Sequence, residues 1–163
     1  MIRLAAIVGF LAALLAVDIV AGVHGQLLLG AATWVALVLA FRALDGERRA
    51  QVVVVVVVAT GAEITGSIIW GVYTYRHENL PAFVPPAHGL VYAGGLALAA
   101  LAARHRHVLV GAALAAVLVW AAAGVTVLPR TDVGGALGAL LLAYFLLRGR
   151  APAVYAGVFL VVA

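Results

Sequence analysis

Polar residues that could do chemistry gather in one stretch of an otherwise apolar chain, residues 61–92. Glu63 is the central candidate, because a carboxylate inside a bilayer costs about 2.5–3.5 kcal/mol on insertion scales and marks a functional site by default. In its neutral form it could donate a proton as a general acid. Asp18 and His88 are the candidate partners in proton transfer. The residues expected to bind a substrate are Ser67, Trp70, Tyr73, Tyr75 and Tyr92.

Each of these residues also has a structural interpretation, which the sequence leaves open. Glu63 could join two helices through a hydrogen bond, and Asp18 could pair with a neighbouring helix or reach the membrane interface. His88 precedes Tyr92 by one helical turn, and both suit an interface as well as a pocket. The other aromatic residues are of the types that form the aromatic belt at a membrane surface.

No metal site and no cofactor are predicted. Asp18, His24, Glu63 and His88 do not follow the spacing of a zinc or di-iron motif. The sequence also lacks a Gly-rich phosphate loop, a nucleophile elbow and a dinucleotide-binding fingerprint. The run RHRH at 104–107 is expected to anchor the chain at the cytoplasmic surface.

The elements that must position these residues follow from the composition. The chain has 163 residues, of which 67% are hydrophobic and 10% charged, and its mean hydropathy is +1.21. Soluble domains are about half apolar and a quarter charged. The sequence therefore predicts an all-α, polytopic transmembrane bundle that forms a single domain over residues 1–163. It has no cysteine, which excludes disulfides and thiolate catalysis.

Six apolar runs are long enough to cross a bilayer as helices. The seven consecutive valines in the third run would favour a strand in water, but an unpaired strand in lipid leaves backbone groups unsatisfied, so a helix is predicted. A seventh run would reach about 16 Å, roughly half of a bilayer core, which suggests that the sequence is a portion of a longer chain. The predicted spans are 3–23, 26–44, 52–75, 86–103, 108–128 and 133–147, with the seventh from 153.

The arginines predict the orientation. With the N-terminus in the cytoplasm, only Arg76 and Arg130 fall outside and all other arginines fall inside, as the positive-inside rule requires. All basic residues are arginine, and Ala, Val and Gly are abundant, which is typical of a GC-rich bacterial genome. We therefore expect a multi-pass protein of the bacterial cytoplasmic membrane. The arginines stand singly in short loops, so nucleic acid is not expected as a partner.

This topology predicts a polar pocket that opens to the outer leaflet. Glu63 lies about 16 Å above Val52 and hence near the bilayer midplane. If the third helix continues to Tyr75, one of its faces carries Thr60, Glu63, Ser67, Trp70 and Thr74. Small residues allow close helix packing in membranes, and the candidates for this role are Gly61, Gly66, Gly71, Gly94 and Gly95.

Residues 63–86 resemble a pattern in membrane-embedded carotenoid enzymes, the acyclic carotenoid hydratases and the heterodimer-type lycopene cyclases, and in several uncharacterised actinobacterial membrane families. The pattern is a mid-helix Glu, a nearby Gly, a Gly-x-Tyr-x-Tyr step and then prolines. Its residues here are Glu63, Gly66, Gly71, Tyr73, Tyr75, Pro81, Pro85 and Pro86. The resemblance implies that a carboxylic acid protonates a polyene and that water or an internal alkene captures the cation, without a redox cofactor.

The preferred interpretation is a cofactor-independent acid/base enzyme that acts on an isoprenoid or other lipid. Glu63 would be the acid, and the aromatic rings would stabilise a cation. A non-catalytic subunit or scaffold of a membrane complex is the first alternative, with a membrane-protein partner or a homo-oligomer. A small transporter or lipid-binding protein is the second. Membrane lipids are expected partners in every case.

Overall fold

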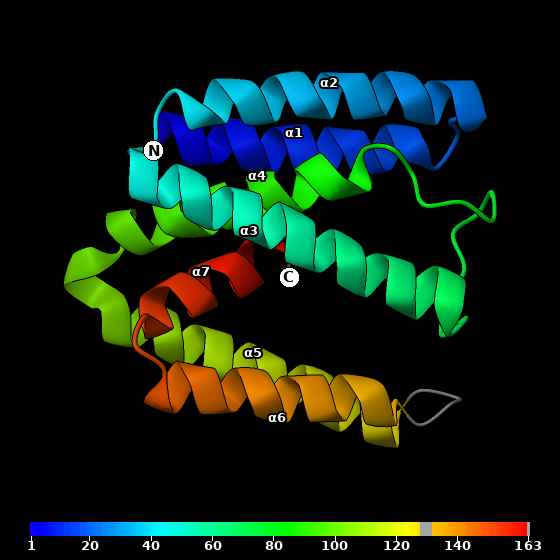
Figure 1. Ribbon diagram of the computed structural model, residues 1–163. Helices are drawn as coiled ribbons and strands as arrows, with labels where there is room; N and C mark the ends of the chain where they lie inside the picture. The colour runs from blue at the N-terminus through cyan, green and yellow to red at the C-terminus, as the bar shows by residue number, and fades with distance from the viewer. Residues whose placement is uncertain (128–131, 163) are drawn as a thin grey trace. The chain divides into compact units, whose positions relative to one another are not determined.

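A computed structural model of the chain describes residues 1–127 and 132–162. All regular elements in these two ranges are helical, which confirms the predicted all-α class (Figure 1). The longer helices are α1 (Ile2–Asp18), α2 (Val23–Phe41), α3 (Gly46–Glu63), α4 (Val84–Leu101), α5 (Arg106–Thr126), α6 (Val133–Arg148) and α7 (Pro152–Val162). A π-helical turn, η1 (Ile64–Ile69), continues α3, and a 3₁₀ turn, η2 (Ala103–His105), precedes α5.

Four helical segments in the described part of the chain are long and apolar enough to cross a membrane. They are Val23–Phe41, Gly46–Ile69, Val84–Leu101 and Ala103–Thr126. The helices α1, α6 and α7 are shorter than these four, with 17, 16 and 11 residues. The structure is consistent with an integral membrane protein, while the count of six spans and a begun seventh stays a prediction.

The third helix ends earlier than the sequence predicts. It was expected to reach Tyr75, but its last helical turn is Ile64–Ile69, with π-helical hydrogen bonding. Gly71 then takes a φ of 60°, a left-handed conformation that glycine adopts without steric cost. Residues 70–83, called the 70–83 connection below, therefore leave the helical face on which the aromatic residues were expected.

Residues 2–93 form one packing unit. In Figure 1, α1 and α2 run antiparallel and side by side, and α3 returns after a short turn. Asp45 begins α3 as its N-cap, and its side chain accepts a hydrogen bond from a backbone N–H of the first turn. The first half of α4 packs on α2 and α3, because Gly89 faces Leu37 and Val56 at a distance that leaves no room for a Cβ.

The fourth helix begins at Val84, two residues before the predicted start at Pro86. Proline is tolerated in the first helical turn, where its missing N–H has no intrahelical partner. Pro81 and Pro86 are both fully buried. The prolines therefore stiffen and bury the end of the 70–83 connection as it enters α4.

Residues 94–162 form the second packing unit. Helices α5 and α6 form an antiparallel hairpin on which α7 packs (Figure 1). Its core consists of Ala113, Val117, Ala139, Leu146 and Ala156. Gly95 of α4 lies against α7, since an added Cβ would come within 2.4 Å of Val158 Cγ2. This is the close helix approach expected of Gly95, whereas Gly61 has nothing within 4 Å of an added Cβ.

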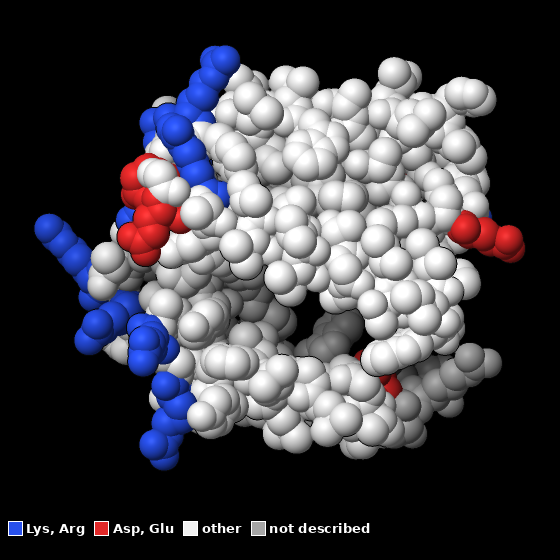
Figure 2. Space-filling view, viewed as in Figure 1, with Lys and Arg blue, Asp and Glu red and all other residues white. Residues whose placement is uncertain are grey.

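Charged side chains lie at helix ends in both units. In residues 2–93 the exposed charges of the α2–α3 turn are Arg42, Asp45, Glu47, Arg48 and Arg49. In Figure 2, charged side chains gather at this turn. The helices of this unit show an uncharged face in the same view. The distribution leaves an apolar band along the helices, as a lipid environment requires.

Candidate functional site

Glu63 meets two tyrosines at the point where α3 passes into its π-helical turn. One carboxylate oxygen, Oε2, accepts hydrogen bonds from the hydroxyls of both Tyr73 and Tyr75, the latter at 2.7 Å. The two rings pack edge to face, with centroids 5.8 Å apart and planes 77° apart. A carboxylate is a strong acceptor for such donors, so the 70–83 connection folds back onto the helix through this one oxygen atom.

The π-helical turn packs against these tyrosines. The Tyr73 ring packs beside Gly66, since a Cβ added there would lie 3.4 Å from Tyr73 Cε1, an ordinary van der Waals distance. Ser67 is 8% exposed, and its hydroxyl donates to the backbone carbonyl of Glu63 at 2.6 Å. Ser67, expected to bind substrate, is thus hydrogen-bonded to the turn. π-helical turns inside helices often occur at functional sites.

His88 approaches the other carboxylate oxygen of Glu63 from α4. Its Nε2 lies 3.6 Å from Glu63 Oε1, which is too long for a hydrogen bond. This nitrogen is buried and makes no hydrogen bond within the described structure. The two oxygens of Glu63 therefore face different groups, the tyrosine pair on one side and the imidazole on the other.

The hydroxyls of Tyr73 and Tyr75 have raised pKa values. For Tyr73 the main cause is the hydrogen bond to Glu63, followed by burial. For Tyr75 burial is the main cause, and the hydrogen bond to Glu63 adds to it. Ionising either hydroxyl would remove a donor and place a second negative charge beside the carboxylate. Both tyrosines therefore remain neutral donors near neutral pH.

Asp18 belongs to a different group of polar residues. It is the last residue of α1, and its Oδ1 accepts from Gln26 Nε2 at 2.9 Å. Gln26 is 2% exposed, and its Oε1 accepts from Asn79 Nδ2 at 3.3 Å. The expected pairing of Asp18 with Glu63 is replaced by this chain of amides, which ties the 70–83 connection to α1 and α2.

Arg76 completes this second group. Its guanidinium donates to the backbone carbonyls of Asp18, Ile19 and Ala21 at the end of α1. Sequence reasoning assigned Arg76 only to the outer loop and gave Gln26 no role. A buried amide in an apolar helix needs partners, so Gln26 was the signal in the sequence that could have indicated this group.

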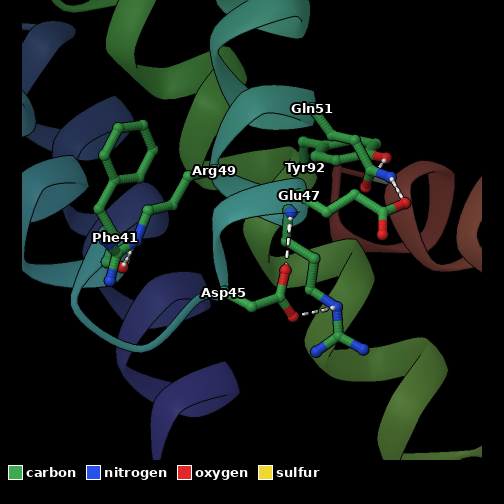
Figure 3. A network of polar contacts seen from close by, with 7 residues as sticks. Phe41, Asp45, Glu47, Arg49, Gln51 and Tyr92 are labelled. Carbon is green, nitrogen blue, oxygen red and sulfur yellow. Dashed lines mark hydrogen bonds and ion pairs between the residues drawn. The ribbon is translucent and has the colours of Figure 1, made fainter.

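Trp70 and Tyr92 are placed apart from the Glu63 group. Trp70 is the C-cap of η1 and is 75% exposed. The Tyr92 hydroxyl donates to Gln51 Oε1 at 3.2 Å, near the start of α3 (Figure 3). Glu63 stands at the opposite end of that helix. The sequence-predicted residues that the structure brings together are thus Glu63, Ser67, Tyr73, Tyr75 and His88.

Figure 3 shows the polar contacts around Gln51 and the α2–α3 turn. Gln51 donates to Glu47 Oε1 at 3.2 Å, and Arg49 Nε donates to the carbonyl of Phe41, the last residue of α2, at 2.9 Å. The Arg49 contact caps the end of α2, and the Gln51–Glu47 bond joins two side chains one turn apart on α3. Among residues 1–127 and 132–162, no group of three or more His, Asp or Glu side chains could hold a metal ion.

No protein-family model matches the chain, and comparisons with curated proteins and with solved structures gave no match.

Proposed function

We propose that this chain is a multi-pass membrane protein that performs cofactor-independent acid/base chemistry on a lipid, with Glu63 and His88 as the proton-handling pair. The observation that supports it most is the meeting of Glu63, two tyrosine hydroxyls and a half-buried imidazole within an apolar helix bundle. Burying such groups is unfavourable. Their convergence on one carboxyl group is more than helix packing requires.

In the proposed mechanism each group has its own task. Tyr73 and Tyr75 donate to Glu63 Oε2 and stabilise the charge that remains when the carboxyl group gives up its proton. Oε1 faces His88 Nε2, which can return a proton after a small side-chain rotation closes the 3.6 Å gap. When Glu63 protonates one carbon of a lipid C=C bond, the π bond breaks and the neighbouring carbon becomes a cation beside the aromatic rings. Loss of a proton from an adjacent C–H, or from a water that adds to the cation, to His88 neutralises it, and His88 then returns this proton to Glu63.

An isoprenoid or other unsaturated lipid is the proposed substrate. The residues that carry the resemblance to carotenoid enzymes include Glu63, Tyr73 and Tyr75, and these three are in direct contact. An alkene that dissolves in the bilayer can reach a carboxyl group near the end of a membrane helix without passing through water. A membrane-bound acid suits such a substrate for that reason.

The topology proposed with this function has six spans and a begun seventh, with the N-terminus in the cytoplasm. In residues 2–93, the 70–83 connection lies at the end of α1, opposite to the α2–α3 turn. The turn carries Arg42, Arg48 and Arg49, whereas the connection carries Arg76 as its one arginine. The positive-inside rule then places the Glu63 site toward the outer leaflet.

A non-catalytic subunit of a membrane complex is the second candidate. It is favoured by the fact that both donors to Glu63 belong to the 70–83 connection, so that the carboxylate also fixes this connection on α3. In that case Glu63 only holds the 70–83 connection in place, and no chemistry follows. The two candidates differ in one measurable property, proton transfer to carbon.

Solvent deuterium tests the proposal. The purified protein in lipid nanodiscs would be incubated in D₂O buffer with a defined polyene hydrocarbon and, separately, with a total bacterial isoprenoid extract. Mass spectrometry then measures deuterium bound to carbon. We expect incorporation with the wild type and a loss of about 10²–10⁴-fold in Glu63→Gln, the range of general acid catalysis.

Glu47→Gln is the matched control, because Glu47 is an exposed carboxylate on the same helix and lies in its first turn. It should leave incorporation unchanged. Equal incorporation by the wild type and Glu63→Gln, or none with either lipid, would overturn the proposed chemistry. Retained assembly with a co-purifying membrane protein in Glu63→Gln would then favour the subunit.

A further inference from the structure

The guanidinium of Arg76 donates to three backbone carbonyls at the end of α1. Nη1 donates to Ile19 O at 2.6 Å, and Nη2 donates to Asp18 O and Ala21 O. The last carbonyls of a helix have no intrahelical N–H partner. Arg76 is far from them in sequence, 57 positions after Ile19, so this contact fixes the 70–83 connection to a distant helix.

The same short segment carries the two tyrosines. Tyr75 directly precedes Arg76 and Tyr73 lies three positions before it, and their hydroxyls reach Glu63 while the guanidinium reaches α1. The connection has little regular structure of its own, and Glu78 has a φ of 54°. Its conformation must therefore be set by its contacts with the helices.

We infer that Arg76 is the positioning residue of the Glu63 site, because it fixes the 70–83 connection on α1 at the distance that brings the Tyr73 and Tyr75 hydroxyls onto the carboxylate. Only the effect of Arg76 on catalysis rests on the proposed function. The contacts themselves are structural.

The other polar contacts of this segment with the ends of α1 and α2 are longer. His77 Nε2 lies 3.1 Å from Ala21 O, and Asn79 reaches Gln26 at 3.3 Å. Arg76 alone contacts three acceptors through two nitrogens. The planar guanidinium presents several donors in a fixed fork, whereas the lysine ammonium is a compact charge on a flexible stem. Lysine at this position should therefore restore the charge but not the geometry.

The pH at which Tyr73 and Tyr75 ionise reports whether their hydroxyls still contact Glu63, and its measurement needs no substrate. Absorbance at about 295 nm follows tyrosinate as the pH rises, and the chain has five tyrosines and no lysine. Subtracting the curve of a Tyr73→Phe/Tyr75→Phe background isolates the pair. In the wild type the pair should ionise above the ordinary value of about 10, because both hydroxyls donate to Glu63.

In Arg76→Gln the midpoint of the pair should fall toward about 10, because the hydroxyls leave the carboxylate. Arg49→Gln is the matched control. Arg49 also caps a helix end through a backbone carbonyl, but at the α2–α3 turn, so the midpoint should not move. If Arg76→Gln does not fold, Arg76→Lys serves the same comparison, with a smaller fall expected.

An unchanged midpoint in a folded Arg76 variant would overturn the inference, as would an equal fall in Arg49→Gln. The readout is independent of catalysis. A midpoint that depends on Arg76, together with deuterium incorporation that does not depend on Glu63, would retain the positioning role and reject the proposed function. The reverse pair of results would retain the function and reject the role of Arg76.

Discussion

The hydroxyl of Tyr75 donates to Glu63 Oε2 at 2.7 Å across 12 positions of sequence. Between the two residues the chain ends a helix in a π-helical turn and passes through a left-handed glycine. A continuous helix would place these side chains about 18 Å apart along its axis. The contact therefore exists only because the helical segment formed by α3 and η1 stops at Ile69.

Removing this hydroxyl should destabilise the fold. Tyr75→Phe leaves a carboxylate oxygen with one donor fewer, and we expect a loss of about 1–2 kcal/mol in the free energy of unfolding. Unfolding by SDS in mixed micelles, followed by circular dichroism, measures it. Tyr144→Phe is the control, because Tyr144 is 61% exposed on α6. Equal stability of Tyr75→Phe and the wild type would mean that the Tyr75 bond contributes little.

Alkaline pH should weaken the fold through the same two tyrosines. Their pKa values are raised in the folded state above the ordinary value of 10.0. Their contribution to stability is therefore complete below pH of about 10 and is lost as the pH rises through the folded values. Midpoints of SDS unfolding between pH about 8 and about 12 should fall more steeply for the wild type than for Tyr73→Phe/Tyr75→Phe. Parallel slopes would contradict this expectation.

Gly95 should not tolerate a side chain. An added Cβ would lie 2.4 Å from Val158 Cγ2 and 2.6 Å from Val158 N, and the backbone atom cannot yield without moving α7. We expect Gly95→Ala to lower the free energy of unfolding by about 1–3 kcal/mol. Gly111→Ala is the control, since nothing lies within 4 Å of a Cβ there. It should leave stability unchanged or raise it by up to about 1 kcal/mol through helix propensity.

The proposed topology can be tested with single cysteines, because the chain contains none. Val72→Cys lies in the 70–83 connection at a position that is 71% exposed, and His105→Cys lies in the exposed η2 turn. In intact cells a membrane-impermeant maleimide should label the first and not the second. After permeabilisation both should react. Labelling of both before permeabilisation, or of His105→Cys alone, would reject the proposed orientation.

The sequence by itself determined the helical class, the apolar environment and the identity of most residues around Glu63. These follow from local rules, since a chain this rich in apolar residues must satisfy its backbone within helices when lipid surrounds it. It also marked Glu63, Tyr73, Tyr75 and His88 as unusual in such surroundings.

Only the tertiary structure decided how those residues meet. The end of α3 depends on Gly71 and the π-helical turn, and Arg76 finds its partners on α1, 57 positions away. Asp18 pairs with Gln26 and not with Glu63. Such contacts join segments that are distant in sequence. Helical periodicity does not predict them, because it shows which residues share a face of one helix and not which residues a loop contacts in the folded chain.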